Sequence, residues 1–463
     1  MWVNGSRGPG RLVVTADGTG VEGRTGTVLL SRTADRVGLT AALRGAVDDC
    51  RNWRDHPPGW VVRDLAVMLA DGGRCTDDIE TLRRRHVAVF GHVASQPTAW
   101  RTIEALAADE LVDIRLFDAL GRARTQAWAA GAAPPDWDDL TVPVTIDIDA
   151  TLVTAHSEKD RTAGNYKGGY GFHPLLAWLD RGDGHGEPLG ALLRPGNAGA
   201  NHAGDNIDVL EQALANLPAM PAGKQVIVRG DSAMATKEFC SYARQASTAV
   251  SVSLPIGRQP RIQAAIRSLH TGKPDVWQPA VRQDGTVREG AHVAELTNPP
   301  LADGWPAGLR VIVRREPLHP GAQQTIDDID GHRFTATLTD VTETDIVAID
   351  RHHRARARIE DRIKDAKDSG LANLPCDDFD RNAIWMLLVL IALNLTSWMQ
   401  LLCLDGDLRT ARLPTLRYRL FHTAARILRH GRQTLVKLQA DWPWAHALVA
   451  AFQRLHQLPA PAT

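Results

Sequence analysis

The segment from His353 to Lys367, HRARARIEDRIKDAK, places acids among cations on a predicted helix. Charged residues recur in it at spacings of three and four, which align on one side of a helix with about 3.6 residues per turn. The members of this stripe are His353, Arg356, Glu360, Lys364 and Lys367. Because the stripe is charged, it is not a core-facing surface. The segment therefore predicts a helix that presents one carboxylate within a basic surface.

Two further acids each follow a β-like run. Asp149 ends the run VTIDID, and Asp231 follows VIVRG. Asp147 lies on the same strand face as Asp149, since alternate residues of a strand point the same way, so the choice between these two stays open. Three carboxylates from distant parts of a chain, one of them among cations, favour a metal-dependent enzyme that acts on a polyanion.

Each acid also has a purely structural interpretation. Asp147 or Asp149 could cap a turn at the end of a strand, and Asp231 could cap the helix that follows it. Glu360 could pair with Arg356 and Lys364 at helical spacing. The functional interpretation therefore depends on the three acids being taken together.

Composition describes a soluble globular protein with room for two to four domains. The chain has 463 residues, 44% hydrophobic content and a formal net charge of -1, with a mean hydropathy of -0.22. The net charge of the whole chain predicts no affinity for nucleic acid, but local basic runs are compatible with a DNA partner. From Leu408 to Lys437 there are eight Arg or Lys residues and no acid. From Arg351 to Lys367 there are seven Arg or Lys residues and three acids. Solvated helix faces are the alternative interpretation of both runs.

Cysteine usage and the N-terminal sequence favour a reducing, cytoplasmic location. The five cysteines are scattered and form no CxxC pair, which argues against disulfides and a zinc knuckle. The first residues, MWVNGSRGPGRL, lack the apolar core of a secretory signal. The uncharged stretch Ile384–Leu404 could span a bilayer by length, but it stands alone and contains polar residues such as Asn394 and Gln400. We expect a buried core helix there, and no membrane partner.

Hydrophobic periodicity divides the chain into four regions. We expect a hairpin over residues 11–31, then helices, with a helix-turn-helix conceivable if Trp100, Arg101 and Glu104 lie on a reading helix. From residue 144 to 256 the order is strand–strand–strand–helix–strand–helix–strand, which is that of an RNase H-like α/β fold with a mixed sheet and flanking helices. The expected regions are a helical DNA-binding region at 1–135, a catalytic core at 141–256 and 345–404, an all-β insertion at 257–344, and a basic helical region at 405–463.

These motifs together resemble those of the DDE transposases of bacterial insertion sequences that carry the Y-R-E-K signature, Y-x-x-R-x-x-x-E-x-x-x-x-x-x-K. Arg356, Glu360 and Lys367 match its spacing, whereas His353 stands at the tyrosine position. The DIDAT run at Asp149 and the RGDS run at Asp231 are similar to the family's first two acidic motifs.

The resemblance implies cut-and-paste transposition on an RNase H-like core that binds two Mg²⁺ ions, with Mn²⁺ as a possible substitute. It implies a bacterial enzyme at the nucleoid, acting on terminal inverted repeats and target DNA, and a homodimer that bridges two DNA ends. Asp149, as the bridging ligand, Asp231 and Glu360 are the implied catalytic and metal-binding residues. The implied DNA-binding residues are His353, Arg356, Lys364 and Lys367.

Other functions remain compatible with the residues. A metal-dependent DNA nuclease of the same fold would use the same site without transposition. A catalytically inactive DNA-binding protein would use the acids structurally. Trp277 and Trp305 of the expected insertion could stack on an extruded base, or could pack within the insertion itself.

Overall fold

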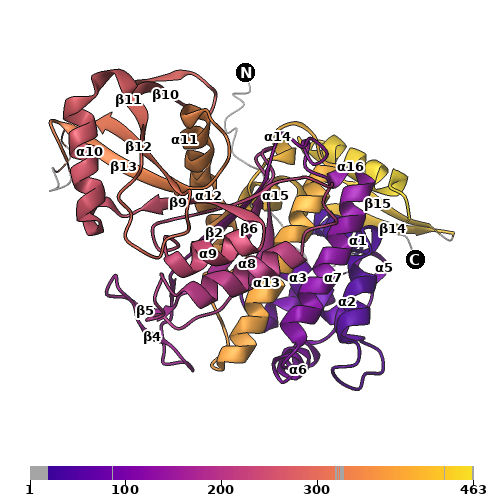
Figure 1. Cartoon of the computed structure of the whole chain (residues 1–463). Coiled ribbons are helices and arrows are strands. Elements are labelled where there is room, and N and C mark those ends of the chain that lie inside the picture. The colour runs from indigo at the N-terminus through magenta and orange to yellow at the C-terminus, as the bar shows by residue number, and fades with distance from the viewer. Residues whose placement is uncertain are drawn as a thin grey trace, which may run out of the picture.

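The computed structural model describes residues 19–85, 87–318, 321, 323, 328–431 and 433–460. A nine-stranded mixed sheet passes through the protein in the order β10-β11-β12-β13-β9-β8-β2-β6-β7 (Figure 1). Its strands are β2 Val144–Ala150, β6 Leu175–Asp180, β7 Gly186–Leu192, β8 Val226–Gly230, β9 Thr248–Leu254, β10 Gln278–Val281, β11 Val287–Leu296, β12 Arg310–Pro317 and β13 His332–Thr339.

The middle of this sheet follows the predicted element order. Strands β2, β8 and β9 are parallel neighbours, while β6 and β7 continue the sheet antiparallel. Helix α8 (Ala203–Ala215) connects β7 to β8, and α9 (Lys237–Gln245) connects β8 to β9. A small sheet of β3 (Val153–Thr154), β4 (Ala163–Gly164) and β5 (Tyr170–Phe172) intervenes after β2, and a glycine-rich turn joins β4 to β5. The parallel pairing brings the carboxyl ends of β2 and β8 to one edge.

Helix α13 (Phe379–Cys403) lies at the centre of the core, as predicted. In the described part of the chain it is the one helix long and apolar enough to cross a membrane, and the apolar window is fully buried within the protein. Two of its polar residues bond within the protein: Asn394 bonds the Pro188 carbonyl and Gln400 bonds the Ala411 carbonyl. An all-round apolar helix can therefore be accommodated by packing against the rest of this chain.

The region before the sheet is helical, as predicted, and shares one continuous apolar core with the sheet and α13. Its helices are α1 Val28–Arg36, α2 Leu39–Val47, α3 Pro58–Ala70, α4 Glu80–Arg83, α5 Val87–Phe90, α6 Gln96–Ala107 and α7 Val112–Ala127. The hairpin expected at 11–31 is wrong for its second half, where α1 begins at Val28; residues 11–18 lie outside the described residues. Strand β1 (Val21–Glu22) pairs with a distant strand, β14, which local periodicity cannot reveal.

Helix α6, the expected reading helix, contacts α13. Arg381 of α13 donates to Glu104 Oε1 at 2.8 Å and lies 5.1 Å from the Trp100 ring centroid. Arg101 remains exposed. These contacts favour a packing role for two of the three residues, and DNA reading by α6 stays a prediction.

The expectation of an all-β insertion at 257–344 is wrong in one respect. Helix α10 (Pro260–Gly272) precedes its strands, because Ile262 and Ile266 recur at helical spacing and are both buried. The strands β10–β13 extend the central sheet, since β13 pairs with β9. Trp277 is only 7% exposed, with the Arg315 guanidinium 4.3 Å from its ring centroid, so its environment favours packing over base stacking. Trp305 is likewise partly buried against the core.

The expectation of a basic helical region at 405–463 is wrong for its middle part, which forms two strands. The chain forms α14 (Gly406–Arg409), α15 (Leu413–Leu416), a hairpin of β14 (Ala425–His430) and β15 (Gln433–Leu438), and α16 (Ala445–Gln457). Ala425 and Ile427 alternate with exposed residues and are buried, which suits a strand. Pairing with β1 completes a three-stranded sheet. The final helix α16 is as predicted.

Candidate active site

Asp149 and Asp231 lie side by side at the carboxyl ends of two parallel strands. Asp147 of β2 is in register with Arg229 of β8. Asp149 lies two residues further along β2, and Asp231 follows Gly230, the last residue of β8. The two carboxylates are close enough for Asp231 to raise the pKa of Asp149. The sheet thus joins two carboxylates that are 82 positions apart in the chain, the difference between 231 and 149.

The electrostatic environment of Asp149 is unbalanced. Burial, aided by the Asp231 and Asp147 carboxylates and opposed by Arg356, raises the pKa of its carboxyl to about 6. The guanidinium of Arg356 lies 3.0 Å from Asp149 Oδ1. Two neighbouring carboxylates with a single adjacent guanidinium repel each other in their charged forms. A cation bound between them would relieve that repulsion.

Asp231 does not cap the helix that follows it. The N-cap of α9 is Thr236, whose hydroxyl accepts from the Phe239 amide. Among the described residues, Asp231 Oδ1 accepts only the Ala233 amide, at 2.9 Å, within the turn after β8. The structural alternative for Asp231 is thus reduced to a local turn contact.

Asp147, the alternative first acid, is fully neutralised. Its side chain is 0% exposed, and its two oxygens accept from Arg229 at 2.7 and 2.9 Å. Arg362 donates a third hydrogen bond, at 3.1 Å. Both arginines also bond Asp180, whose pKa is held well below its usual range by Arg362, Arg229 and Arg358 against the effect of burial. This geometry favours Asp149 over Asp147 as the first acid.

The expected single helix from His353 to Lys367 is divided. Helix α11 (Ile346–Arg354) ends in a 3₁₀ turn, Ala355–Ala357, before α12 (Arg358–Ala366), and a π turn begins at Lys367. A 3₁₀ turn has three residues per turn, so the side chains before and after it no longer form one stripe. Periodicity in the sequence did not reveal this break.

His353 is held by strand β9 instead of facing the exposed surface of α12. Its Nδ1 and Nε2 lie 3.0 and 3.1 Å from the hydroxyls of Ser251 and Ser253. Burial, aided by Arg229 and Arg356, lowers the pKa of its imidazole to about 3. With both ring nitrogens engaged and the ring neutral, this environment favours an anchoring role over the predicted phosphate contact.

Glu360 is exposed and does not form the ion pairs of its structural alternative. Arg356 pairs with Asp149, and Lys364 Nζ lies 3.2 Å from Asp361 Oδ1. Glu360 makes no hydrogen bond or ion pair with any described residue. Among those residues there is also no group of three His, Cys, Asp or Glu side chains that could hold a metal ion. The structure thus joins Asp149 to Asp231 without bringing Glu360 into the pair.

Two lysines add positive charge beyond the end of α12. Lys367 is half-buried, and burial together with Lys167 lowers the pKa of its ammonium group. Lys167 lies in the glycine-rich turn between β4 and β5. Sequence reasoning missed Lys167, because a lone lysine in a polar turn carries no signal until the fold places it beside Lys367.

Residues 7–460 match the family model described as transposase DDE domain group 1. The chain therefore belongs to this family of DDE transposases. No curated protein matches the chain. Among solved structures, the cryo-EM structure of a piggyBac transposase synaptic complex with hairpin DNA aligns with a TM-score of 0.40 and 9% identity, covering 86% of this chain and 79% of that one.

Proposed function

We propose that this protein catalyses cut-and-paste transposition of a bacterial insertion sequence by metal-dependent phosphodiester hydrolysis and strand transfer. The observation that carries the proposal is the pairing of Asp149 with Asp231 at the ends of adjacent parallel strands. Within a transposase family, two carboxylates whose charge one guanidinium compensates only in part provide a site for divalent cations near a phosphate.

The finer family assignment rests on order and spacing. The strands β7-β6-β2-β8-β9, with helices between β7, β8 and β9, support an RNase H-like core. Arg356, Glu360 and Lys367 support membership of the Y-R-E-K group, with His353 replacing its tyrosine. A histidine held by two serines differs in chemistry from a tyrosine that reaches DNA, and this is the main departure from the group's pattern.

The residues present fit a hard divalent cation. Carboxylate oxygens are the ligands that Mg²⁺ and Mn²⁺ prefer, and two of them already adjoin in Asp149 and Asp231. Glu360 is the proposed third ligand. Two bound ions would supply Lewis acidity and an activated oxygen nucleophile for in-line displacement at phosphorus.

The chain's own cations have separate roles in this proposal. Arg356 compensates the charge of Asp149 and can turn to a DNA phosphate when a metal ion takes its place. Lys364 in α12 and Lys367 just after it supply point charges for phosphates of the DNA backbone. The proposed partners are terminal inverted repeats and target DNA, bridged by a homodimer at the bacterial nucleoid.

The decisive experiment is cleavage of supercoiled DNA that carries the flanking terminal repeats, in Mg²⁺ or Mn²⁺. Wild type is compared with Asp149→Asn, Glu360→Ala and the control Asp361→Asn, which changes an exposed acid beside Glu360. We expect metal-dependent cuts at the repeat ends that the first two changes abolish and the control retains.

Each other outcome identifies a different error. Cutting at random positions without joining to target DNA would indicate the nuclease alternative. DNA binding without any metal-dependent cutting would indicate the inactive alternative. Full cutting by Glu360→Ala would remove Glu360 from the site while leaving Asp149 and Asp231 in it.

A further inference from the structure

Six of the eight cations between Leu408 and Lys437 fall into two groups of three. Arg409, Arg412 and Arg417 bond to other parts of the chain: Arg409 bonds the Leu401 carbonyl at 2.7 Å, and Arg417 bonds the Ala70 carbonyl at 2.8 Å. Arg412 bonds the carboxylates of Asp365 in α12 and Asp368 just after it. These three arginines connect neighbouring elements, so their positive charge is already used within the protein.

The second group, Arg426, Arg429 and Lys437, lies on the β14–β15 hairpin and is exposed. With the described residues these three side chains form no hydrogen bond or ion pair. Arg426 and Lys437 are direct cross-strand partners in the register of the hairpin. Like charges directly opposite each other destabilise a strand pair. The hairpin therefore carries a repulsion that its own fold does not require.

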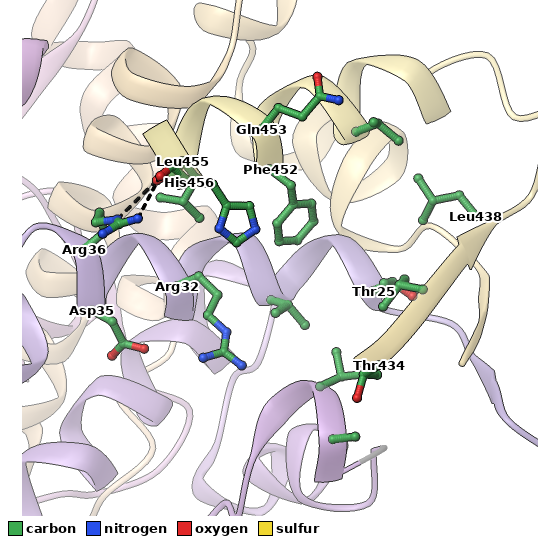
Figure 2. A pocket seen from close by; sticks show the side chains of 15 residues that line it. Thr25, Arg32, Asp35, Arg36, Thr434, Leu438, Phe452, Gln453, Leu455 and His456 are labelled. Atoms are coloured by element: carbon green, nitrogen blue, oxygen red, sulfur yellow. Dashed lines mark hydrogen bonds between the residues drawn. The ribbon is translucent and has the colours of Figure 1, made fainter. Parts of the chain in front are cut away.

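The hairpin has an inner and an outer face. Ile427 is buried, and Thr434 and Leu438 line a cavity of about 660 Å³ against α1 and α16 (Figure 2). Arg36 fixes the wall of this cavity by bonds to two carbonyls of α16 (Figure 2). Because alternate residues of a strand point to opposite faces, Arg426 and Lys437 lie on the outer face.

We propose that the outer face of the β14–β15 hairpin contacts the sugar–phosphate backbone of duplex DNA, at a place separate from the Asp149 edge. The proposal rests on the proposed function, which supplies the DNA. The hairpin projects from the body of the protein beside α1 and α16 (Figure 1). A two-stranded ribbon fits the major groove, and phosphates on either side would neutralise the Arg426–Lys437 repulsion.

A second copy of the chain is the less favoured occupant. A two-fold contact through this face would place the same cations of both copies against each other. No acid lies between Leu408 and Lys437 to compensate them. DNA supplies the complementary charge that another copy of this face does not.

The test compares salt dependence of duplex binding for wild type, the double variant Arg426→Gln/Lys437→Gln and a matched control. The control, Arg261→Gln/Arg267→Gln, removes two exposed cations of α10, outside the expected DNA-binding region at 1–135. Each lost phosphate contact lowers the slope of log affinity against log salt by about 0.9. We expect the slope of the double variant to fall by about 1.8, so that wild type loses roughly tenfold more affinity between 50 and 200 mM salt. The control slope should be unchanged.

The remaining outcomes separate this inference from the proposed function. An unchanged slope in a double variant that still cleaves repeat ends overturns the hairpin contact alone. If the double variant has the lower slope but the wild type never cleaves DNA in the presence of metal ions, the proposed function alone is overturned. A shift in molar mass by light scattering with an unchanged slope would assign the face to a second copy. Since the double variant removes a repulsion, its melting temperature should not fall. If it does fall, the single variant Lys437→Gln replaces it in the binding test, with an expected slope change of about 0.9.

Discussion

Asp147 and Asp149 lie on the same face of one strand, two residues apart, yet their surroundings differ completely. Asp147 accepts three hydrogen bonds from two arginines and is fully buried. Asp149 has one guanidinium contact and faces a second carboxylate, Asp231. A buried charge that is fully paired can serve the fold, whereas an incompletely compensated pair leaves room for a cation from solution.

The surroundings of Asp149 lower the stability of the fold, whereas those of Asp147 do not. Pairing Asp147 with Arg229 and Arg362 offsets the desolvation of all three charges. Holding Asp149 beside Asp231 destabilises the folded chain while both are ionised. A site that tolerates such repulsion is a functional candidate, and each prediction below changes one side of this comparison.

The largest expected effect is on activity. Asp149→Asn or Asp231→Asn should lower metal-dependent DNA cleavage by on the order of a thousandfold or more, since metal ions contribute several kcal/mol to such reactions. Because the folded pKa of Asp149 is raised, its ionisation opposes folding above about pH 6. Asp149→Asn should therefore raise the free energy of unfolding at pH 7 and have little effect on it below pH 4. A variant that cleaves normally would show that the acid is not in the site.

The matched change at the other aspartate should act on stability. Asp147→Asn leaves Arg229 and Arg362 without a full counter-charge, and breaking a buried pair destabilises by about 3–5 kcal/mol. Urea unfolding at pH 7 measures this loss. If Asp147→Asn instead abolished cleavage at unchanged stability, Asp147 would be the first acid and the comparison would be reversed.

His353→Gln should change how stability depends on pH. The pKa of His353 is lowered to about 3, so the neutral ring stabilises the fold fully above pH 6.5 and this contribution is lost as pH falls toward 3. At pH 5 the loss in wild type amounts to about 2 kcal/mol at most. The destabilisation caused by His353→Gln should accordingly be smaller at pH 5 than at pH 7. Equal differences at both values would argue against a neutral, buried ring.

The smallest expected effect is on metal affinity. A carboxyl with a pKa of about 6 is mostly protonated at pH 5, and a bound metal ion requires the carboxylate. Affinity for Mn²⁺ should therefore fall about tenfold from pH 7 to pH 5, with proton release on binding. Calorimetry in buffers of different ionisation enthalpy measures both quantities. An affinity independent of pH over this range would exclude Asp149 as a ligand that titrates there.

Local patterns predicted some parts of the fold well. The strand–helix order from Val144 to Leu254 and the buried helix α13 follow from periodicity and apolar length. The C-terminal hairpin was missed because its strand β14 pairs with β1, some 400 residues earlier in the chain. In this pairing Val21 lies opposite Arg426. Helix α10 was overlooked within a region rich in strands.

The sequence by itself indicated the DDE transposase family and supplied the candidate acids and the cations around them, because residue type and spacing carry that information directly. Only the tertiary structure decided which charges are compensated. It neutralised Asp147, left Asp149 beside Asp231, anchored His353 on β9, and separated the C-terminal cations that are paired within the protein from those on the β14–β15 hairpin. Charge compensation depends on distances between residues far apart in the chain, and those distances exist only once the sheet has formed.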